Sequence, residues 1–90
     1  CPMGWIVSFV GQKGGTGKSG LCQALGVEAA KNGASVLIAD LDEAQRTSFE
    51  WGEARALNNI EPPVKVVLES RLKVLTLADQ CELLAVDAPG

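Results

Sequence analysis

The sequence predicts an open α/β fold with a mostly parallel sheet and helices on both faces, and three observations support this prediction. Four short apolar segments alternate along the 90 residues with segments of helical or loop character. The apolar segments are nearly continuous rather than alternating with polar residues, which is typical of strands buried on both faces of a sheet. The helical segments between them can provide the right-handed crossovers that parallel strands require.

Local signals mark the four expected strands. The first is rich in aromatic and β-branched residues, which indicates a buried strand. Pro62 and Pro63 precede the third strand and disfavour a helix there, while Asp40 and Asp87 end the second and the fourth. The expected strands span residues 5–10, 35–40, 64–69 and 82–87.

Three helices are expected between these strands, spanning residues 18–32, 47–57 and 70–79. Gly33 follows the first and suits the position just beyond a helix C-terminus. Thr47, followed three residues later by Glu50, indicates a capping box at the start of the second, although Ser48 competes with Thr47 for the cap. Two further residues are interpreted as core residues, namely Cys22 in the first helix and Trp51 in the second.

Composition excludes several classes of protein. The formal net charge is −3, so this stretch carries no general basic footprint for nucleic acid. No apolar run approaches the roughly eighteen residues that a transmembrane helix needs, and no signal peptide is visible. Three widely spaced cysteines and the absence of histidine argue against a disulfide framework or a zinc site. We therefore expect a cytoplasmic protein without a transmembrane segment.

The end of the chain indicates a larger domain. Pro89 and Gly90 follow directly on the last expected strand, with no helix after it. An open sheet of four strands would leave an unpaired edge and an uncovered apolar face. We therefore expect residues 1–90 to be the N-terminal half of an α/β domain of about 200 residues.

A glycine-rich stretch, FVGQKGGTGKSG at residues 9–20, lies between the first expected strand and the first expected helix. Glycines at such a turn let backbone N–H groups converge, and the helix N-terminus adds partial positive charge. Lys18 could then reach the β and γ oxygens of a polyphosphate, and Ser19 could offer its hydroxyl to Mg²⁺. The strict pattern G-x-x-x-x-G-K-[ST] fails at Gln12, yet the context still predicts a phosphate-binding loop.

Acidic residues follow two of the apolar strands. Asp40 and Asp42 lie at the end of the second expected strand, and Asp87 lies at the end of the fourth. Open α/β sheets bind ligands at the carboxyl ends of their strands. A single acid there is more often a cap, but three in register with a phosphate-binding loop indicate a functional site.

The stretch QKGGTGKS at residues 12–19 resembles the deviant Walker A motif, K-G-G-x-G-K-[ST], of the ParA/MinD family of ATPases. The resemblance implies the P-loop NTPase fold, ATP and Mg²⁺ as cofactors, and catalytic roles for Lys13 and Lys18. Lys13 would reach across an ATP-sandwiched homodimer and stabilise charge on the partner's transferring phosphoryl group. The nucleotide-binding residues that the resemblance implies are Gly14, Gly15, Thr16, Gly17, Lys18, Ser19 and Gly20.

Two other stretches extend the resemblance. DLD at residues 40–42 matches the family's D-x-D, whose second acid, Asp42 here, positions or activates the attacking water. LLAVDAPG at residues 83–90 resembles a Walker B strand followed by the switch II turn. The magnesium ligands implied by these motifs, directly or through water, are Ser19, Asp40 and Asp87.

Some positions depart from the family pattern. Glu43 and Ala44 stand where Pro-Gln is common, and Gln45 comes one place later. Gly20 stands where the family usually has threonine, so it offers no hydroxyl to the α-phosphate. These departures concern the nucleotide contacts and the loop after the D-x-D rather than the fold.

We expect a short ParA-type ATPase that partitions plasmid or chromosomal DNA. ATP would drive dimerisation and non-specific, nucleoid-associated DNA binding through a C-terminal half, and a ParB-like centromere-binding adaptor would stimulate weak hydrolysis. One alternative is a MinD-like or polysaccharide-system ATPase acting at a membrane or cell pole. Others are a metabolic kinase or synthetase of the dethiobiotin type, and a nucleotide-gated binding module with little turnover.

Overall fold

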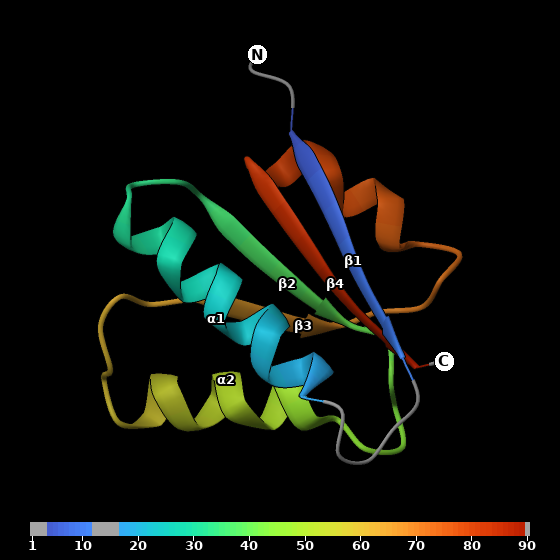
Figure 1. Cartoon of the computed structure of the whole chain (residues 1–90), viewed down its shortest axis with the longest axis horizontal. Coiled ribbons are helices and arrows are strands. Elements are labelled where there is room, and N and C mark those ends of the chain that lie inside the picture. Colours follow the sequence, from blue (N-terminus) through green and yellow to red (C-terminus); the bar gives the residue numbers. More distant parts are fainter. Residues whose placement is uncertain (1–3, 12–16, 90) are drawn as a thin grey trace.

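The computed structural model describes residues 4–11 and 17–89, and within them a four-stranded sheet lies between two α-helices and a 3₁₀ helix (Figure 1). The regular elements agree with their predicted positions to within two residues, except in the third helical segment. In chain order they are β1 (Trp5–Gly11), α1 (Lys18–Lys31), β2 (Val36–Asp40), α2 (Thr47–Leu57), β3 (Lys65–Leu68), η1 (Val74–Gln80) and β4 (Leu83–Pro89).

The strand order is β1-β4-β2-β3, and every neighbouring pair is parallel. The predicted α/β fold with a parallel sheet is therefore confirmed. Asp40 of β2 is in register with Asp87 of β4, and Asp87 is also in register with Phe9 of β1. The two acids thus lie side by side near the carboxyl ends of β2 and β4. The chain leaves β2 for α2 at this edge of the sheet (Figure 1).

Each face of the sheet carries its own apolar cluster. Helices α1 and α2 cover one face, where Cys22 and Trp51 pack with strand residues such as Ile38. The η1 segment covers the other face and contributes Val74. The central strands β2 and β4 are buried on both sides over most of their length, as their continuous apolar sequences predict.

Strand β1 differs from the prediction of a buried strand. It lies at the edge of the described sheet and pairs only with β4. Trp5 and Val10 are therefore 73% and 64% exposed. An apolar sequence predicts a strand here correctly, but it does not reveal which strand occupies the edge.

The predicted capping box at the start of α2 is wrong. The N-cap residue is Arg46, in a left-handed conformation (φ 53°), and no side chain at the cap accepts a hydrogen bond. The carboxylate of Asp40 accepts the Phe49 N–H instead, at 2.9 Å. The Glu50 N–H, which a capping box would join to the Thr47 side chain, donates to the Arg46 carbonyl at 2.9 Å.

The third predicted helix is a 3₁₀ helix, and it begins four residues later than expected. The Thr76 N–H donates to the Lys73 carbonyl at 3.0 Å, and the Thr76 hydroxyl donates to the same oxygen at 2.6 Å. Leu72 and Leu75 are 95% and 65% exposed. Val74 and Leu77, three residues apart, both pack on the sheet, and this spacing matches the three residues per turn of a 3₁₀ helix.

The end of α1 confirms the prediction for Gly33. This glycine has φ 90°, a conformation that residues with a Cβ rarely adopt. Its N–H donates to the Ala30 carbonyl, and the Ala34 N–H donates to the Ala29 carbonyl, both at 3.1 Å. This pair of bonds is the Schellman motif, which stops the helix and turns the chain toward β2.

Gly52 allows α2 to approach β3 closely, and Gly52→Ala is expected to destabilise the protein by about 1–3 kcal/mol. A Cβ at this buried position would lie 2.5 Å from Cγ2 and 2.8 Å from Cβ of Val66. Urea denaturation would measure the loss. Gly20→Ala is the control, because its Cβ would meet no atom within 4 Å and alanine favours a helix. Equal stability of Gly52→Ala and the wild type would contradict the close α2–β3 packing.

Candidate functional site

The centre of the candidate site is the carboxylate of Asp87, near the carboxyl end of β4. Lys18, the first residue of α1, forms an ion pair with its Oδ1. The neighbouring Ser19 hydroxyl donates to its Oδ2 at 2.8 Å. The side chains of Lys18 and Asp87 are only 13% and 2% exposed. The fold thus brings a cation and a hydroxyl that are adjacent in sequence to a carboxylate almost 70 residues further along the chain.

Ser48 is a member of the site that the sequence analysis did not identify. Its hydroxyl, fully buried in the first turn of α2, donates to Oδ2 of Asp87 at 2.6 Å. Gln23 of α1 in turn donates its Nε2–H to the Ser48 Oγ at 3.1 Å. In the sequence Ser48 competes with Thr47 as a helix cap, and only the fold shows that its hydroxyl faces β4.

Hydrogen bonds keep Asp87 ionised despite its burial. Burial alone would raise the pKa of this carboxyl, because the charged form loses its hydration. The bonds from Lys18, Ser48 and Ser19 outweigh that effect, and the pKa of Asp87 lies below its ordinary value. Asp87 is therefore a carboxylate at neutral pH, the form that can bind a cation.

Asp40 makes two hydrogen bonds to backbone amides. It is fully buried, and its Oδ1 accepts the Asp42 N–H at 3.0 Å while its Oδ2 accepts the Phe49 N–H at 2.9 Å. These bonds attach both ends of the connection between β2 and α2 to the sheet. The contacts are those of a residue that shapes the loop, and its place in a magnesium shell stays a prediction.

Asp42 is half-buried just beyond β2, at the same edge of the sheet as Asp87. Its Oδ1 accepts the Gln45 N–H at 3.1 Å, so the side chain closes the turn that follows. One carboxylate oxygen, Oδ2, accepts no hydrogen bond from the described residues. The position and the open oxygen are compatible with the predicted action on water, which the structure does not test.

Within the glycine-rich stretch, the described residues resume at Gly17, whose φ of 76° suits glycine. Gly17 is the N-cap of α1 and, as a glycine, makes no side-chain hydrogen bond at this helix end. The first amides of α1 are therefore suited to an anion. Gly20, with its exposed position in α1, offers no hydroxyl. The predicted residues Lys13, Gly14, Gly15 and Thr16 lie outside the described residues.

The donor set suits a magnesium ion bound together with phosphates. Mg²⁺ prefers oxygen ligands, keeps several waters and usually takes only one or two carboxylates. Ser19 and Asp87 supply a hydroxyl and a carboxylate in contact with one another. The described residues contain no cluster of three or more His, Cys, Asp or Glu side chains that could hold a metal alone. Phosphate and water oxygens would therefore complete the shell.

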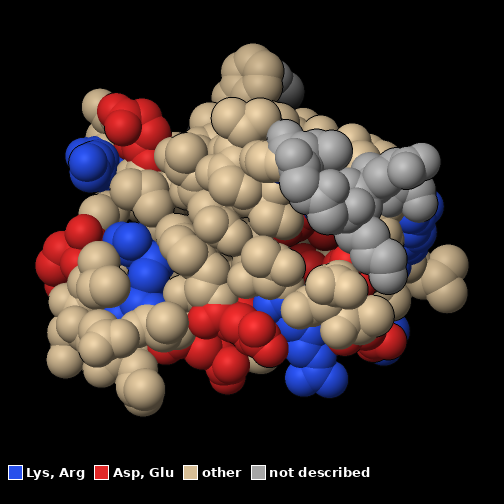
Figure 2. Space-filling model, turned by 60° about the horizontal axis from the view of Figure 1, so that its bottom comes forward, with Lys and Arg blue, Asp and Glu red and all other residues tan. Residues whose placement is uncertain are grey.

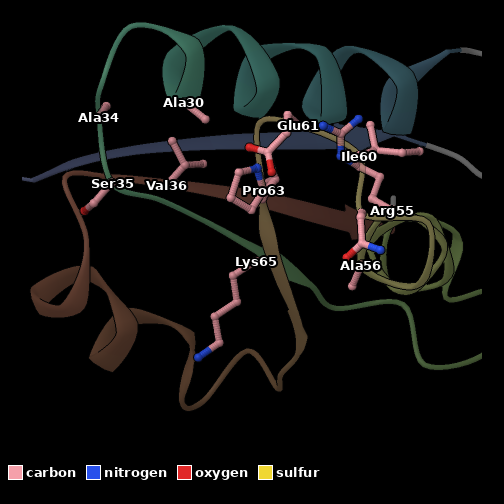
Figure 3. A pocket seen from close by; sticks show the side chains of 12 residues that line it. Ala30, Ala34, Ser35, Val36, Arg55, Ala56, Ile60, Glu61, Pro63 and Lys65 are labelled. Atoms are coloured by element: carbon pink, nitrogen blue, oxygen red, sulfur yellow. The ribbon is translucent and has the colours of Figure 1, made fainter.

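A hollow of about 510 Å³ lies away from these residues (Figure 3). Ala30 of α1 and Ala56 of α2 line it, together with Val36 and Lys65, the first residues of β2 and β3. It is thus at the amino end of the strands, opposite Asp87. Parallel sheets bind ligands at the carboxyl end, which favours the Asp87 cluster as the functional site.

The surface charge agrees with the composition. On the face shown in Figure 2, lysine and arginine side chains are interspersed with acidic ones, and no broad basic patch is visible. The formal net charge of the chain is −3. The part of this face that the structure describes therefore offers no extended basic surface for nucleic acid. Among the described residues, no helix is long and apolar enough to cross a membrane.

Comparison with protein families decides the assignment. The family model of the CobQ/CobB/MinD/ParA nucleotide binding domain matches residues 7–85. The chain belongs to this family. The predicted resemblance to ParA and MinD proteins is thereby confirmed at the level of the CobQ/CobB/MinD/ParA family. The match includes Lys18, Ser19 and Ser48 and ends two residues before Asp87. A comparison with curated proteins found no significant match.

Proposed function

We propose that this chain binds ATP and Mg²⁺ at the carboxyl end of its sheet and hydrolyses ATP, which releases the γ-phosphate. The observation that carries the proposal is the contact of Lys18 and Ser19, at the start of α1, with the buried Asp87 carboxylate. A charged lysine beside an open helix N-terminus suits a polyphosphate. A hydroxyl and a carboxylate in contact with one another suit its metal ion.

Each residue has a separate task in this proposal. Lys18 leaves its ion pair with Asp87 and contacts the β- and γ-phosphate oxygens of the nucleotide. The first amides of α1 also bind the phosphates. Ser19 and Asp87 hold Mg²⁺, which when bound neutralises charge on the phosphate oxygens. Asp42, on the loop after β2, orients the attacking water and accepts its proton.

We further propose that ATP binding drives homodimerisation in a partition system for plasmid or chromosomal DNA. This role rests on the likeness of residues 12–19 to the deviant Walker A motif and on the family match at residues 7–85. A ParB-like centromere-binding adaptor would stimulate hydrolysis, and residues outside this chain would bind DNA. A MinD-like ATPase at a membrane would share the same nucleotide site and differ in what it binds.

ATP turnover in the presence of candidate targets tests these proposals. Phosphate release would be measured with the protein alone, with double-stranded DNA and with anionic phospholipid vesicles. We expect Mg²⁺-dependent ATP binding with slow release that DNA accelerates. Acceleration by vesicles alone would favour the MinD-like function, tight ATP binding without any turnover would favour a nucleotide-gated binding module, and no ATP binding would refute the nucleotide site.

Lys13→Ala is expected to leave ATP binding by the monomer within about twofold of the wild type but to lower dimer-dependent turnover by at least a hundredfold. A lysine supplied in trans acts on the transferring phosphoryl group, and such cations contribute roughly 10³–10⁵ to turnover. ATP titration and phosphate release at increasing protein concentration would measure the two effects. Lys31→Ala, at the far end of α1, is the control. Normal turnover of Lys13→Ala would contradict the role in trans.

A further inference from the structure

Ser48 connects three elements at the candidate site. Its hydroxyl, at the start of α2, donates to Oδ2 of Asp87 in β4 at 2.6 Å. Because its single O–H donates a hydrogen bond to Asp87, the hydroxyl oxygen accepts the hydrogen bond from Gln23 Nε2 of α1, at 3.1 Å. Ser48 is fully buried and Asp87 is 2% exposed. A chain of hydrogen bonds therefore runs from the partly exposed Gln23 of α1 through the buried Ser48 of α2 to Asp87.

The bonds to Asp87 divide between its two oxygens. Lys18 contacts Oδ1, whereas Ser19 and Ser48 both donate to Oδ2. When Lys18 turns to the nucleotide, Oδ1 loses its cation and becomes free to act in the magnesium shell. The two hydroxyls then remain to hold the carboxylate in its orientation. Ser19 is itself an expected magnesium ligand, which leaves Ser48 as the donor that is fixed by the protein alone.

We propose that Ser48 is a positioning residue that orients the Asp87 carboxylate for Mg²⁺ and couples the occupied site to helix α2. This inference rests on the proposed function, because it assigns a residue to the same ATP site. Ser48 acts through Asp87 and need not touch the nucleotide. Groups that orient a metal ligand in this way typically change metal affinity by 10–100-fold when they are removed.

Trp51 provides a reporter for the coupling. It lies one helical turn after Ser48 on α2, and the guanidinium of Arg55 lies 5.1 Å from the centre of its ring. The chain has one other tryptophan, Trp5, which is 73% exposed. In a Trp5→Phe background, Trp51 emission therefore reports on α2 alone.

The experiment compares Ser48→Ala with Thr47→Ala, the neighbouring residue, whose side chain is exposed. Each protein is titrated with a fluorescent ATP analogue, first in the presence of EDTA and then at increasing MgCl₂ concentrations. Trp51 emission is recorded throughout. For Ser48→Ala we expect binding in EDTA within about twofold of the wild type. We also expect a rise of at least about tenfold in the Mg²⁺ concentration that tightens binding, and loss of the Trp51 response. Thr47→Ala should match the wild type.

Two outcomes separate failure of the inference from failure of the proposed function. If the wild type binds the ATP analogue with Mg²⁺ and Ser48→Ala shows the same Mg²⁺ requirement and Trp51 response, the inference alone is wrong. If the wild type binds no analogue, the proposed function fails and the inference fails with it. Should Ser48→Ala not fold, Gln23→Met removes the donor that directs the hydroxyl. It should then shift the Mg²⁺ requirement in the same direction, and no shift would overturn the inference.

Discussion

Lys18→Ala is expected to weaken ATP binding by about 10- to 100-fold. The substitution removes a charge-assisted contact to the phosphates, and a bond of this kind contributes about 1.5–3 kcal/mol in a partly buried site. Because each 1.4 kcal/mol corresponds to a tenfold change in affinity, this range corresponds to a factor of about 10 to 100. Titration with a fluorescent ATP analogue in the presence of MgCl₂ would measure the change.

The same substitution is also expected to lower the free energy of unfolding. Lys18 is the cationic partner of Asp87, whose side chain is 2% exposed, and removing one partner of a buried ion pair costs about 3–5 kcal/mol. The double variant Lys18→Ala/Asp87→Asn removes the uncompensated charge and should recover part of the lost stability. Lys31→Ala, at the exposed end of the same helix, is the control for binding. ATP affinity unchanged in a folded Lys18→Ala protein would refute the phosphate-binding loop.

Continuous apolar segments predicted the parallel sheet because the two strands buried on both faces, β2 and β4, carry the strongest signal. Ile38, in the middle of β2, and Leu84, near the start of β4, are fully buried. The placement of Asp40 and Asp87 at one edge follows from the same pattern, since the carboxyl ends of parallel strands share one edge. Their direct adjacency depends on the pairing of β2 with β4. Cys22, interpreted as a core residue, is also fully buried, and burial raises the pKa of its thiol to about 12.

The features that the sequence did not reveal depend on contacts between distant residues. Ser48 bonds to a carboxylate 39 positions away, so its local pattern indicates only a helix start. The cap of α2 comes from Asp40 and not from Thr47 or Glu50, because the loop returns to the strand it left. The exposure of β1 depends on strand order, which no local pattern encodes. Local sequence thus predicts elements well, whereas partners across the fold need coordinates.

Asp42→Asn is expected to lower ATP turnover by about a hundredfold or more while ATP binding stays within about twofold of the wild type. General acid–base catalysis by a positioned group contributes roughly 10²–10⁴-fold, and an amide cannot accept a proton from water as a carboxylate does. Single-turnover phosphate release and ATP titration would separate the two quantities. Loss of hydrolysis with retained binding should also trap the ATP-bound dimer, which size-exclusion chromatography would detect.

The choice of asparagine separates chemistry from loop structure. Oδ1 of Asp42 accepts the Gln45 N–H at 3.1 Å, and the carbonyl oxygen of asparagine can accept the same bond. Asp42→Ala removes both the carboxylate and this bond, so it should lower turnover at least as much as Asp42→Asn and also loosen the turn. If Asp42→Asn hydrolyses ATP at the wild-type rate while Asp42→Ala does not, the carboxylate serves the turn alone. The residue that activates water would then have to be sought elsewhere.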